Sequence, residues 1–161
     1  RDESDPARLL SIGARVDAWR LLTRDILDKP GLQPVTDTVV KVDALSGRGV
    51  LFPMASLNAA GGMRPRALPH YLADYEVSLR VRKSGWRLLI LSSAAVYSTD
   101  DYGSSRRAVS LRQKLFSAHS PFYLPALLVF WWEASNWLQR LTLPLRVPLL
   151  IFFPRLRKPP V

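Results

Sequence analysis

Glycines divide residues 40–91 into short segments whose patterns change from strand to helix and back to strand. Val40, Val42 and Ala44 alternate with charged residues, which is the pattern of a half-buried strand. Helices are predicted over residues 53–60 and 72–84, and glycines follow each of them. Another strand is predicted directly after the second helix. This order of elements predicts an α/β fold.

The segments around this stretch carry weaker patterns. Residues 9–19 suit a strand and a turn, and residues 21–27 are predicted to be a short helix or an irregular segment. Residues 35–45 are rich in β-branched side chains and include the first strand. The strand after the second helix is predicted over residues 86–91, and residues 94–97 are predicted to form another strand or to continue it.

A polar loop is predicted over residues 100–107, and from residue 109 the chain becomes apolar, aromatic and basic. Residues 121–139 carry a single charge and nearly reach the roughly 20 residues that a membrane-spanning helix needs. Three arrangements fit this stretch: an interfacial helix lying on a bilayer, a helix packed on the domain, and a true span. Its one-sided leucine stripe and its tryptophans favour the interfacial helix. Residues 141–153 are apolar again but contain Pro144, Arg146 and Pro148.

The net charge of +10 is unevenly distributed along the 161 residues. Residues 1–100 carry 14 basic and 11 acidic side chains, a balance of +3, whereas residues 101–161 carry 9 and 2, a balance of +7. A basic tail indicates an anionic partner, either nucleic acid or anionic lipid. The basic residues do not alternate with spaced aromatics as in a nucleic-acid-binding module. We therefore expect an anionic membrane surface as partner and no nucleic acid.

Composition excludes several kinds of site. The chain has no cysteine, so disulfides, thiolate chemistry and zinc sites with sulfur ligands are ruled out. Its two histidines, His70 and His119, are far apart in the sequence, which argues against a histidine-built metal site. The chain begins with Arg1 rather than Met, which suggests a cut or incomplete gene product, a processed protein or a trimmed polypeptide.

One carboxylate occupies a position suited to catalysis. Asp74 falls in the first turn of the helix predicted over residues 72–84, where the helix dipole and free backbone amides favour a negative charge. A carboxylate held there can serve as a general base, or it can simply cap the helix. Glu76 follows two residues later, on a different side of the helix.

Gly47, Arg48 and Gly49 separate two strand-like runs. Glycines at such a position let the backbone approach a ligand or turn sharply, and an arginine can pair with a phosphate or a carboxylate. The spacing is too short for a Rossmann or P-loop motif, and no Lys-Ser/Thr pair follows. A plain turn is the alternative.

The motifs of residues 46–87 follow one another in a recognisable order. Ser-Gly-Arg-Gly-Val-Leu-Phe-Pro is followed by a short helix, Gly-Gly, Pro-His-Tyr-Leu-Ala-Asp-Tyr-Glu and Ser-Leu-Arg-Val-Arg-Lys-Ser-Gly-Trp-Arg. This order resembles the second half of family-2 glycosyltransferases. There, a Gly-Gly-Phe-Asp segment precedes a Glu-Asp-x-Asp-Leu-x-x-Arg helix, which ends in Lys-x-Gly-Tyr/Phe-Arg and a strand. The resemblance is close over residues 45–99 and loose over residues 9–44.

The resemblance implies the GT-A fold. The expected fold class is α/β, with a partial Rossmann-like GT-A layer in a domain over residues 1–100. A helical, apolar and basic tail over residues 101–161 follows and is expected to be membrane-associated. The implied activity is inverting transfer of a sugar from a nucleotide-sugar donor to a hydroxyl of a glycan or lipid-linked acceptor. Asp74 aligns with the catalytic general base.

The resemblance also implies roles for the residues around that base. Gly47, Arg48 and Gly49 align with the segment that lies beside the donor sugar and the acceptor. Glu76 stands where the family often has a second acid and is expected to bind substrate, as are His70 and Tyr71. A structural role is implied for Arg80, which we expect to brace the helix by pairing with an acidic neighbour.

The chain departs from the family pattern at several positions. Ala73 replaces the usual Glu before the base, and residues 63–65 read Met-Arg-Pro instead of Phe-Asp-Glu. No Asp-x-Asp metal motif is present at a strand end. We therefore expect a nucleotide-binding half of roughly 100 residues to be absent, with the isolated chain inactive. A divalent cation, Mg²⁺ or Mn²⁺, is expected for the complete enzyme, with no ligand from this chain.

Two functional classes therefore stand at this point. The first is a sugar-transfer enzyme fragment involved in polysaccharide biosynthesis, located in the cytoplasm at the inner face of the cell membrane. The second is a non-catalytic membrane-surface interaction module that retains a degenerate transferase framework, and the departures at Ala73 and Met63 motivate it. In either class the apolar tail could also pair with a second copy as a homo-oligomer.

Overall fold

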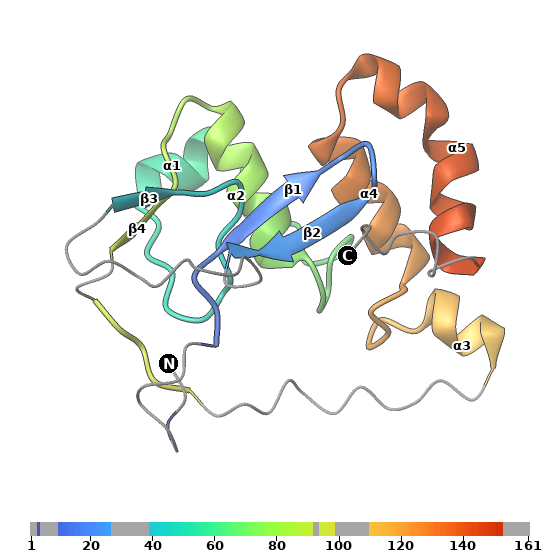
Figure 1. The fold of residues 1–161 in the computed structure, drawn as a ribbon, viewed down its shortest axis with the longest axis horizontal. Helices are drawn as coiled ribbons and strands as arrows, with labels where there is room; N and C mark the ends of the chain where they lie inside the picture. Colours follow the sequence, from blue (N-terminus) through green and yellow to red (C-terminus); the bar gives the residue numbers. More distant parts are fainter. Residues whose placement is uncertain (1–2, 4–9, 27–38, 92–93, 99–109, 153–161) are drawn as a thin grey trace. The chain divides into compact units, whose positions relative to one another are not determined.

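The computed structural model describes residues 3, 10–26, 39–91, 94–98 and 110–152 (Figure 1). Contacts divide the chain into two compact units. The domain boundary expected at residue 100 stays a prediction. Unit 1 consists of Arg1–Arg15, Arg24–Met63 and Asp74–Ser104, and unit 2 of Val16–Thr23, Arg64–Ala73 and Ser105–Val161.

The described residues form a mixed α/β structure with five helices and two sheets of two strands each. This agrees with the coarse fold class predicted from the sequence. Among these helices, none is long and apolar enough to cross a membrane.

Unit 1 contains an antiparallel pair of strands, β3 (Val39–Lys41) and β4 (Leu89–Leu91), and two helices, α1 (Met54–Ala59) and α2 (Ala73–Lys83) (Figure 1). In the register of the strands, Val40 lies opposite Ile90. The predicted alternation continues beyond β3, because Val42 and Ala44 are buried whereas Lys41 is exposed. The core of unit 1 is apolar and is formed by Ile26, Val42, Ala60, Val77, Val81 and Leu88.

Proline and glycine set the ends of α1, as the sequence predicts. Pro53 is the N-cap residue, and Gly61 and Gly62 follow the helix with positive φ values of 75° and 73°. Glycine adopts this left-handed conformation without the steric cost that a β-carbon brings. The helices predicted over residues 53–60 and 72–84 are therefore confirmed as α1 and α2.

The first two strands form a hairpin, which corrects one sequence-based prediction. β1 (Ala14–Asp17) pairs with β2 (Leu22–Asp25), where residues 21–27 were expected to be helical or irregular. The Asp17 carboxylate accepts hydrogen bonds from the backbone N–H groups of Trp19 and Arg20, both at 3.0 Å. This turn reverses the chain, so the residues after it pair as a strand.

Unit 2 contains three helices: α3 (Leu111–Phe116), α4 (Leu124–Ala134) and α5 (Trp137–Phe152). Ser110 caps α3, because its side chain accepts a hydrogen bond from the backbone N–H of Gln113. α3 contacts α4, and α4 contacts α5. The buried side chains of α4 and α5 include Phe130, Trp131 and Val147.

The prediction of a single helix over residues 121–139 is wrong, because the helix is interrupted at Ser135. This residue is extended, with φ −95° and ψ 146°. Asn136 and Gln139 then cap each other reciprocally: the N–H of Asn136 donates to Gln139 Oε1 at 2.8 Å, and the N–H of Gln139 donates to Asn136 Oδ1 at 2.9 Å. Such a capping box starts a new helix, so α5 begins at Trp137.

α5 continues through two prolines. Pro144 and Pro148 lack the backbone N–H that a helix uses, yet both lie inside α5. They are one turn apart and exposed, where the carbonyl groups that lose their partners can be solvated. Arg146 lies between them and donates to the carbonyl oxygens of Ala18 and Trp19. Desolvation lowers the pKa of the Arg146 guanidinium, and the charge of Asp17 acts in the opposite direction.

The remaining differences between the predicted and the observed elements concern the strands of unit 1. The strand expected over residues 86–91 is shorter, because only Leu89–Leu91 pair with β3. Residues 94–97 form no strand. The polar loop predicted over residues 100–107 lies outside the described residues, as does the segment 35–38 of the first predicted strand.

Candidate active site

Asp74 lies in the first turn of α2 and is partly exposed. Its Oδ2 accepts a hydrogen bond of 2.7 Å from the backbone N–H of Gly47, and its Oδ1 accepts one of 2.9 Å from the N–H of Tyr75. A β-carbon at Gly47 would lie 3.5 Å from Asp74 Oδ2. The Gly-Arg-Gly segment and the candidate base, 27 residues apart, are thus in direct contact.

A second bridge joins the same two segments. The backbone N–H of Leu45 donates to Ser78 Oγ at 3.2 Å, and Ser78 Oγ donates to the carbonyl oxygen of Asp74 at 2.7 Å. Ser78 is fully buried. Sequence reasoning assigned no role to Ser78, because its partner is 33 residues away and no local pattern identifies such a contact. The first turn of α2 is therefore fixed to the chain after β3 at two points.

Arg80 joins α2 to the end of α1. Its guanidinium donates two hydrogen bonds to Glu76, of 2.7 Å to Oε1 and 2.8 Å to Oε2, and both side chains are buried. It also donates to the carbonyl oxygen of Gly62 at 2.7 Å and to that of Ala60. Arg80 thus pairs with an acidic neighbour and holds the glycine segment that precedes α2.

Glu76 is enclosed by this arrangement. Only 1% of its surface is exposed, and both carboxylate oxygens accept hydrogen bonds from Arg80. The sequence had suggested Glu76 as a substrate-binding residue. In this structure it faces Arg80 inside unit 1, whereas Asp74 faces Gly47, so the two acids of α2 take part in different contacts.

The glycines around Arg48 differ in their surroundings. Gly47 has room for a β-carbon at ordinary contact distance, whereas a β-carbon at Gly49 would lie 2.5 Å from Val96 Cγ2. Gly49 also has a positive φ of 81°. Arg48 is partly exposed. The backbone of Gly49 therefore fits closely against Val96, and that of Gly47 fits against the candidate base.

His70 and Tyr71, the other two residues expected to bind substrate, belong to unit 2. Their rings stack with centroids 5.0 Å apart, and the ring of His119 lies edge-on to His70 at 5.1 Å. The two histidines that are distant in the sequence are therefore neighbours in unit 2.

Two further predictions concern metal ligands and the motif departures. In the part of the chain that the structure describes, no group of three or more His, Asp or Glu side chains is arranged to hold a metal ion. The divalent cation expected for the complete enzyme therefore stays a prediction. Arg64, one of the residues that depart from the family motif, forms a 3.0 Å ion pair with Glu133 in unit 2.

No protein-family model matches the chain, and no curated protein and no solved structure gives a significant match. The resemblance to family-2 glycosyltransferases therefore stays a prediction from the sequence.

Proposed function

We propose that this chain carries the acceptor-activating part of an inverting glycosyltransferase of the GT-A fold. Asp74 is the general base, and the segment containing Gly47, Arg48 and Gly49 lies beside the reacting sugar. The substrates on this proposal are a nucleotide-sugar donor and a hydroxyl group of a glycan or lipid-linked acceptor.

The observation that carries the proposal is the contact between Asp74 and Gly47. The resemblance to family-2 transferases predicts that the base and the Gly-Arg-Gly segment serve one site, and Asp74 Oδ2 lies 2.7 Å from the Gly47 nitrogen. Motifs that share a site must meet in space, and 27 residues separate these two in the sequence. The contact therefore agrees with an independent requirement of the proposal.

The carboxylate keeps the capacity to accept a proton. A carboxylate offers about four lone-pair positions, and the two hydrogen bonds from Gly47 and Tyr75 use one on each oxygen. The side chain is also partly exposed, so an acceptor hydroxyl can reach it.

The reaction on this proposal is a single displacement. The acceptor oxygen attacks the anomeric carbon of the donor while its proton passes to Asp74. The new glycosidic bond forms as the bond between that carbon and the diphosphate oxygen breaks, and the electron pair leaves with the nucleoside diphosphate. Attack from the face opposite the leaving group inverts the configuration.

Arg80 has a positioning role in this scheme. It holds Glu76 on α2 and the carbonyl oxygens of Ala60 and Gly62 at the end of α1. These hydrogen bonds fix the helix that presents Asp74, and a base within hydrogen-bond reach of its substrate must be held to a fraction of an ångström. Arg80 itself is 6% exposed and needs no contact with substrate for this role.

The test uses a polypeptide in which residues 1–161 are joined to the nucleotide-binding half that the resemblance implies. We call it the joined polypeptide. Transfer of labelled sugar from UDP-, GDP- and dTDP-sugars to a membrane extract would be measured for the wild type and for Asp74→Asn. We expect the variant to lose transfer by about 100- to 10,000-fold, the usual contribution of a general base. Near-normal transfer would remove Asp74 from this role.

Asp43→Asn is the matched control. It removes the same charge from unit 1, at a carboxylate that pairs with Arg82 at the surface. Transfer should be retained in this variant. Equal losses in both variants would show that the effect comes from charge or stability rather than from the base.

The non-catalytic interaction module is the second candidate, and one observation favours it. Both carboxylate oxygens of Asp74 accept hydrogen bonds from backbone N–H groups, as the carboxylate of a purely structural helix cap does. On this alternative, Asp74→Asn lowers the stability of the chain, and the joined polypeptide transfers no sugar even as the wild type.

A further inference from the structure

α5 is apolar on two opposite faces. Its buried face is formed by Leu143, Val147, Leu150 and Ile151, with the capping residue Gln139 at its start. A second apolar row, which we call the α5 ridge, is exposed and consists of Trp137, Leu141, Leu145, Leu149 and Phe152. At about 100° per residue, the centre of the ridge lies roughly 180° from that of the buried face.

The ridge is continuous and well exposed. Its members are spaced by four, four, four and three residues, so they line one side of the helix. Trp137, Leu141 and Leu145 are 73%, 69% and 74% exposed. The side of a surface helix away from its core is normally polar, and a contiguous apolar row there marks a binding surface.

Positive charge flanks the ridge. Arg140 and Arg146 lie on α5 roughly 120° from the ridge, one on each side. Arg140 donates to the carbonyl oxygen of Trp132 at 3.1 Å, and its guanidinium lies 4.8 Å from the centre of the Trp132 ring. The sequence from Trp137 onward contains five basic and no acidic residues. The surface that meets the ridge should therefore be apolar inside and anionic at its edge.

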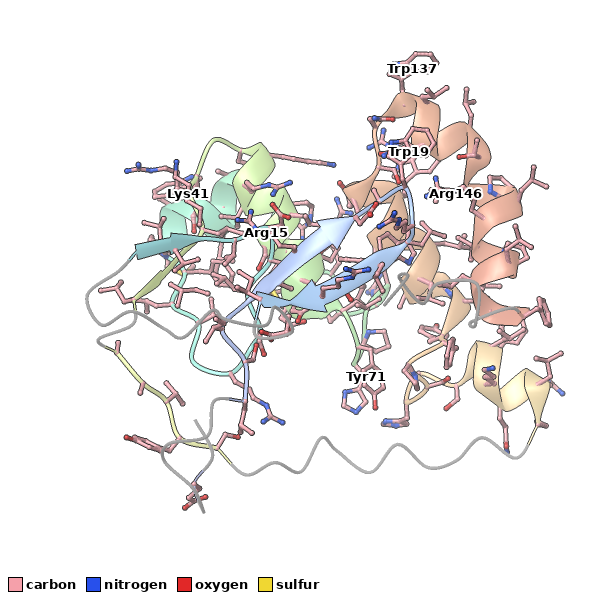
Figure 2. All side chains as sticks on the ribbon, in the orientation of Figure 1. Arg15, Trp19, Lys41, Tyr71, Trp137 and Arg146 are labelled. Atoms are coloured by element: carbon pink, nitrogen blue, oxygen red, sulfur yellow. The ribbon has the colours of Figure 1, made fainter. Side chains whose placement is uncertain are left out.

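Exposed tryptophans lie at the amino-terminal end of the ridge. Trp132 on α4 is 52% exposed, and Trp137 is the first residue of α5. Figure 2 shows Trp137 projecting from the start of α5 and Trp19 near Arg146, whose guanidinium lies 5.4 Å from the Trp19 ring centre. Tryptophan rings prefer the boundary between lipid headgroups and acyl chains.

We propose that the α5 ridge inserts into the headgroup boundary of an anionic lipid bilayer, with α5 lying parallel to the surface. The leucines enter the outer acyl region, and the positive charges of Arg140 and Arg146 are attracted to the anionic headgroups. This inference assigns the lipid surface to α5, not to the stretch 121–139 that the sequence favoured. It is independent of the proposed sugar transfer.

Charge favours a bilayer over a second copy of the chain. If two ridges packed against each other, two chains that each carry a net charge of +10 would be brought together. Like charges at an interface oppose association, whereas anionic lipid attracts the same groups.

Vesicle binding by the 161-residue chain tests this inference. The vesicles would be phosphatidylcholine alone or equal parts of phosphatidylcholine and phosphatidylglycerol, and binding would be measured by sedimentation and by the blue shift of tryptophan fluorescence. The wild type should bind the mixed vesicles. We expect Leu141→Glu/Leu145→Glu to lower partitioning by about 100-fold or more, because two leucines no longer enter the acyl region.

Leu51→Glu/Met54→Glu is the matched control. Leu51 and Met54 in unit 1 are 91% and 68% exposed, and this variant changes the net charge by the same amount. It should bind anionic vesicles far better than the ridge variant does. Far-ultraviolet circular dichroism, equal for the two variants, excludes loss of folding as the cause.

Three results would overturn the inference. Equal binding by the ridge variant and its control would exclude the ridge as the contact. Failure of the wild type to bind mixed vesicles would exclude the anionic bilayer. A wild-type dimer in sedimentation equilibrium that Leu141→Glu/Leu145→Glu dissociates would show that a second copy occupies the ridge. None of these results depends on sugar transfer.

Discussion

Arg80 and Glu76 face each other one turn apart on α2, joined by two hydrogen bonds of 2.7 and 2.8 Å inside unit 1. With 6% and 1% of their surfaces exposed, neither charge is solvated by bulk water. Two buried charges need each other and further hydrogen bonds to offset their desolvation. Arg80 obtains these from the carbonyl oxygens of Ala60 and Gly62, so the pair also connects two helices.

Removing one member of this pair should strongly destabilise the chain. Arg80→Met leaves the Glu76 carboxylate buried without its cation and leaves two carbonyl groups without their donor. We expect the free energy of unfolding to fall by about 3–5 kcal/mol, measured by urea denaturation.

The exposed pair of Arg82 and Asp43 provides the comparison. Arg82→Met should cost less than about 1 kcal/mol, because a solvated ion pair contributes little. If Arg80→Met cost no more than Arg82→Met, the structural role of the buried pair would be contradicted.

Replacing each of the two glycines beside Arg48 by alanine should have a different consequence. Gly47→Ala places a methyl group at ordinary contact distance from Asp74, so stability should change by less than about 1 kcal/mol. On the proposed function, that methyl group crowds the base, and transfer by the joined polypeptide should fall.

Gly49→Ala should instead destabilise unit 1. Gly49 has a positive φ, and the added β-carbon would lie 2.5 Å from Val96. We expect a loss of about 1–3 kcal/mol in thermal or urea unfolding. Equal stability of the two variants would contradict the close fit between Gly49 and Val96.

The reciprocal cap at the start of α5 should be measurable as well. Asn136→Ala removes the side chain that accepts the N–H of Gln139, and the expected cost is about 0.5–2 kcal/mol with some loss of helical circular dichroism. Asn58→Ala makes the same change at an exposed position inside α1 and should be within about 0.5 kcal/mol of the wild type. A larger effect at Asn58 than at Asn136 would exclude the cap as the cause of the helix break.

Arg146 should stabilise the turn between β1 and β2. Arg146→Met keeps part of the side-chain stem but removes the donors to the carbonyl oxygens of Ala18 and Trp19. We expect a loss of about 1–3 kcal/mol and a change in the fluorescence of Trp19. Arg15→Met, at an exposed arginine 3.7 Å from Asp43, should cost less than about 1 kcal/mol. The same small cost in both variants would contradict the role of Arg146.

Local signals account for the parts of the fold that the sequence predicts. Pro53 and the two glycines after Ala60 delimit α1, and the apolar spacing of residues 72–84 predicts α2. These features act within a few residues of the element that they define, so one sequence is sufficient to find them.

Other elements depend on side-chain caps rather than on apolar periodicity. The Asp17 turn produces β2, and the Asn-x-x-Gln box at residues 136–139 produces the break before α5. Both are side-chain caps of backbone groups, and apolar periodicity alone does not detect them.

The residues of the candidate site also fall into two groups, those that the sequence identifies and those that only the structure reveals. Asp74 and Arg80 were found because helix position and motif order identify them. The resemblance places Asp74 and Gly47 at one site but does not give the hydrogen bond between them. The bridge through Ser78 could not be predicted, because it depends on how segments 33 residues apart meet. The enclosure of Glu76 by Arg80 is likewise a result of packing and not of spacing.

The most direct test of Asp74 as the base is a single-turnover measurement on the joined polypeptide. Donor is bound first at a saturating concentration, acceptor is then added, and the rate of the transfer step is followed for the wild type and for Asp74→Asn. This design separates chemistry from donor binding. The account predicts the same amount of bound donor in both proteins and a transfer rate about 100- to 10,000-fold lower in the variant. An unchanged transfer rate with equal donor binding would contradict it.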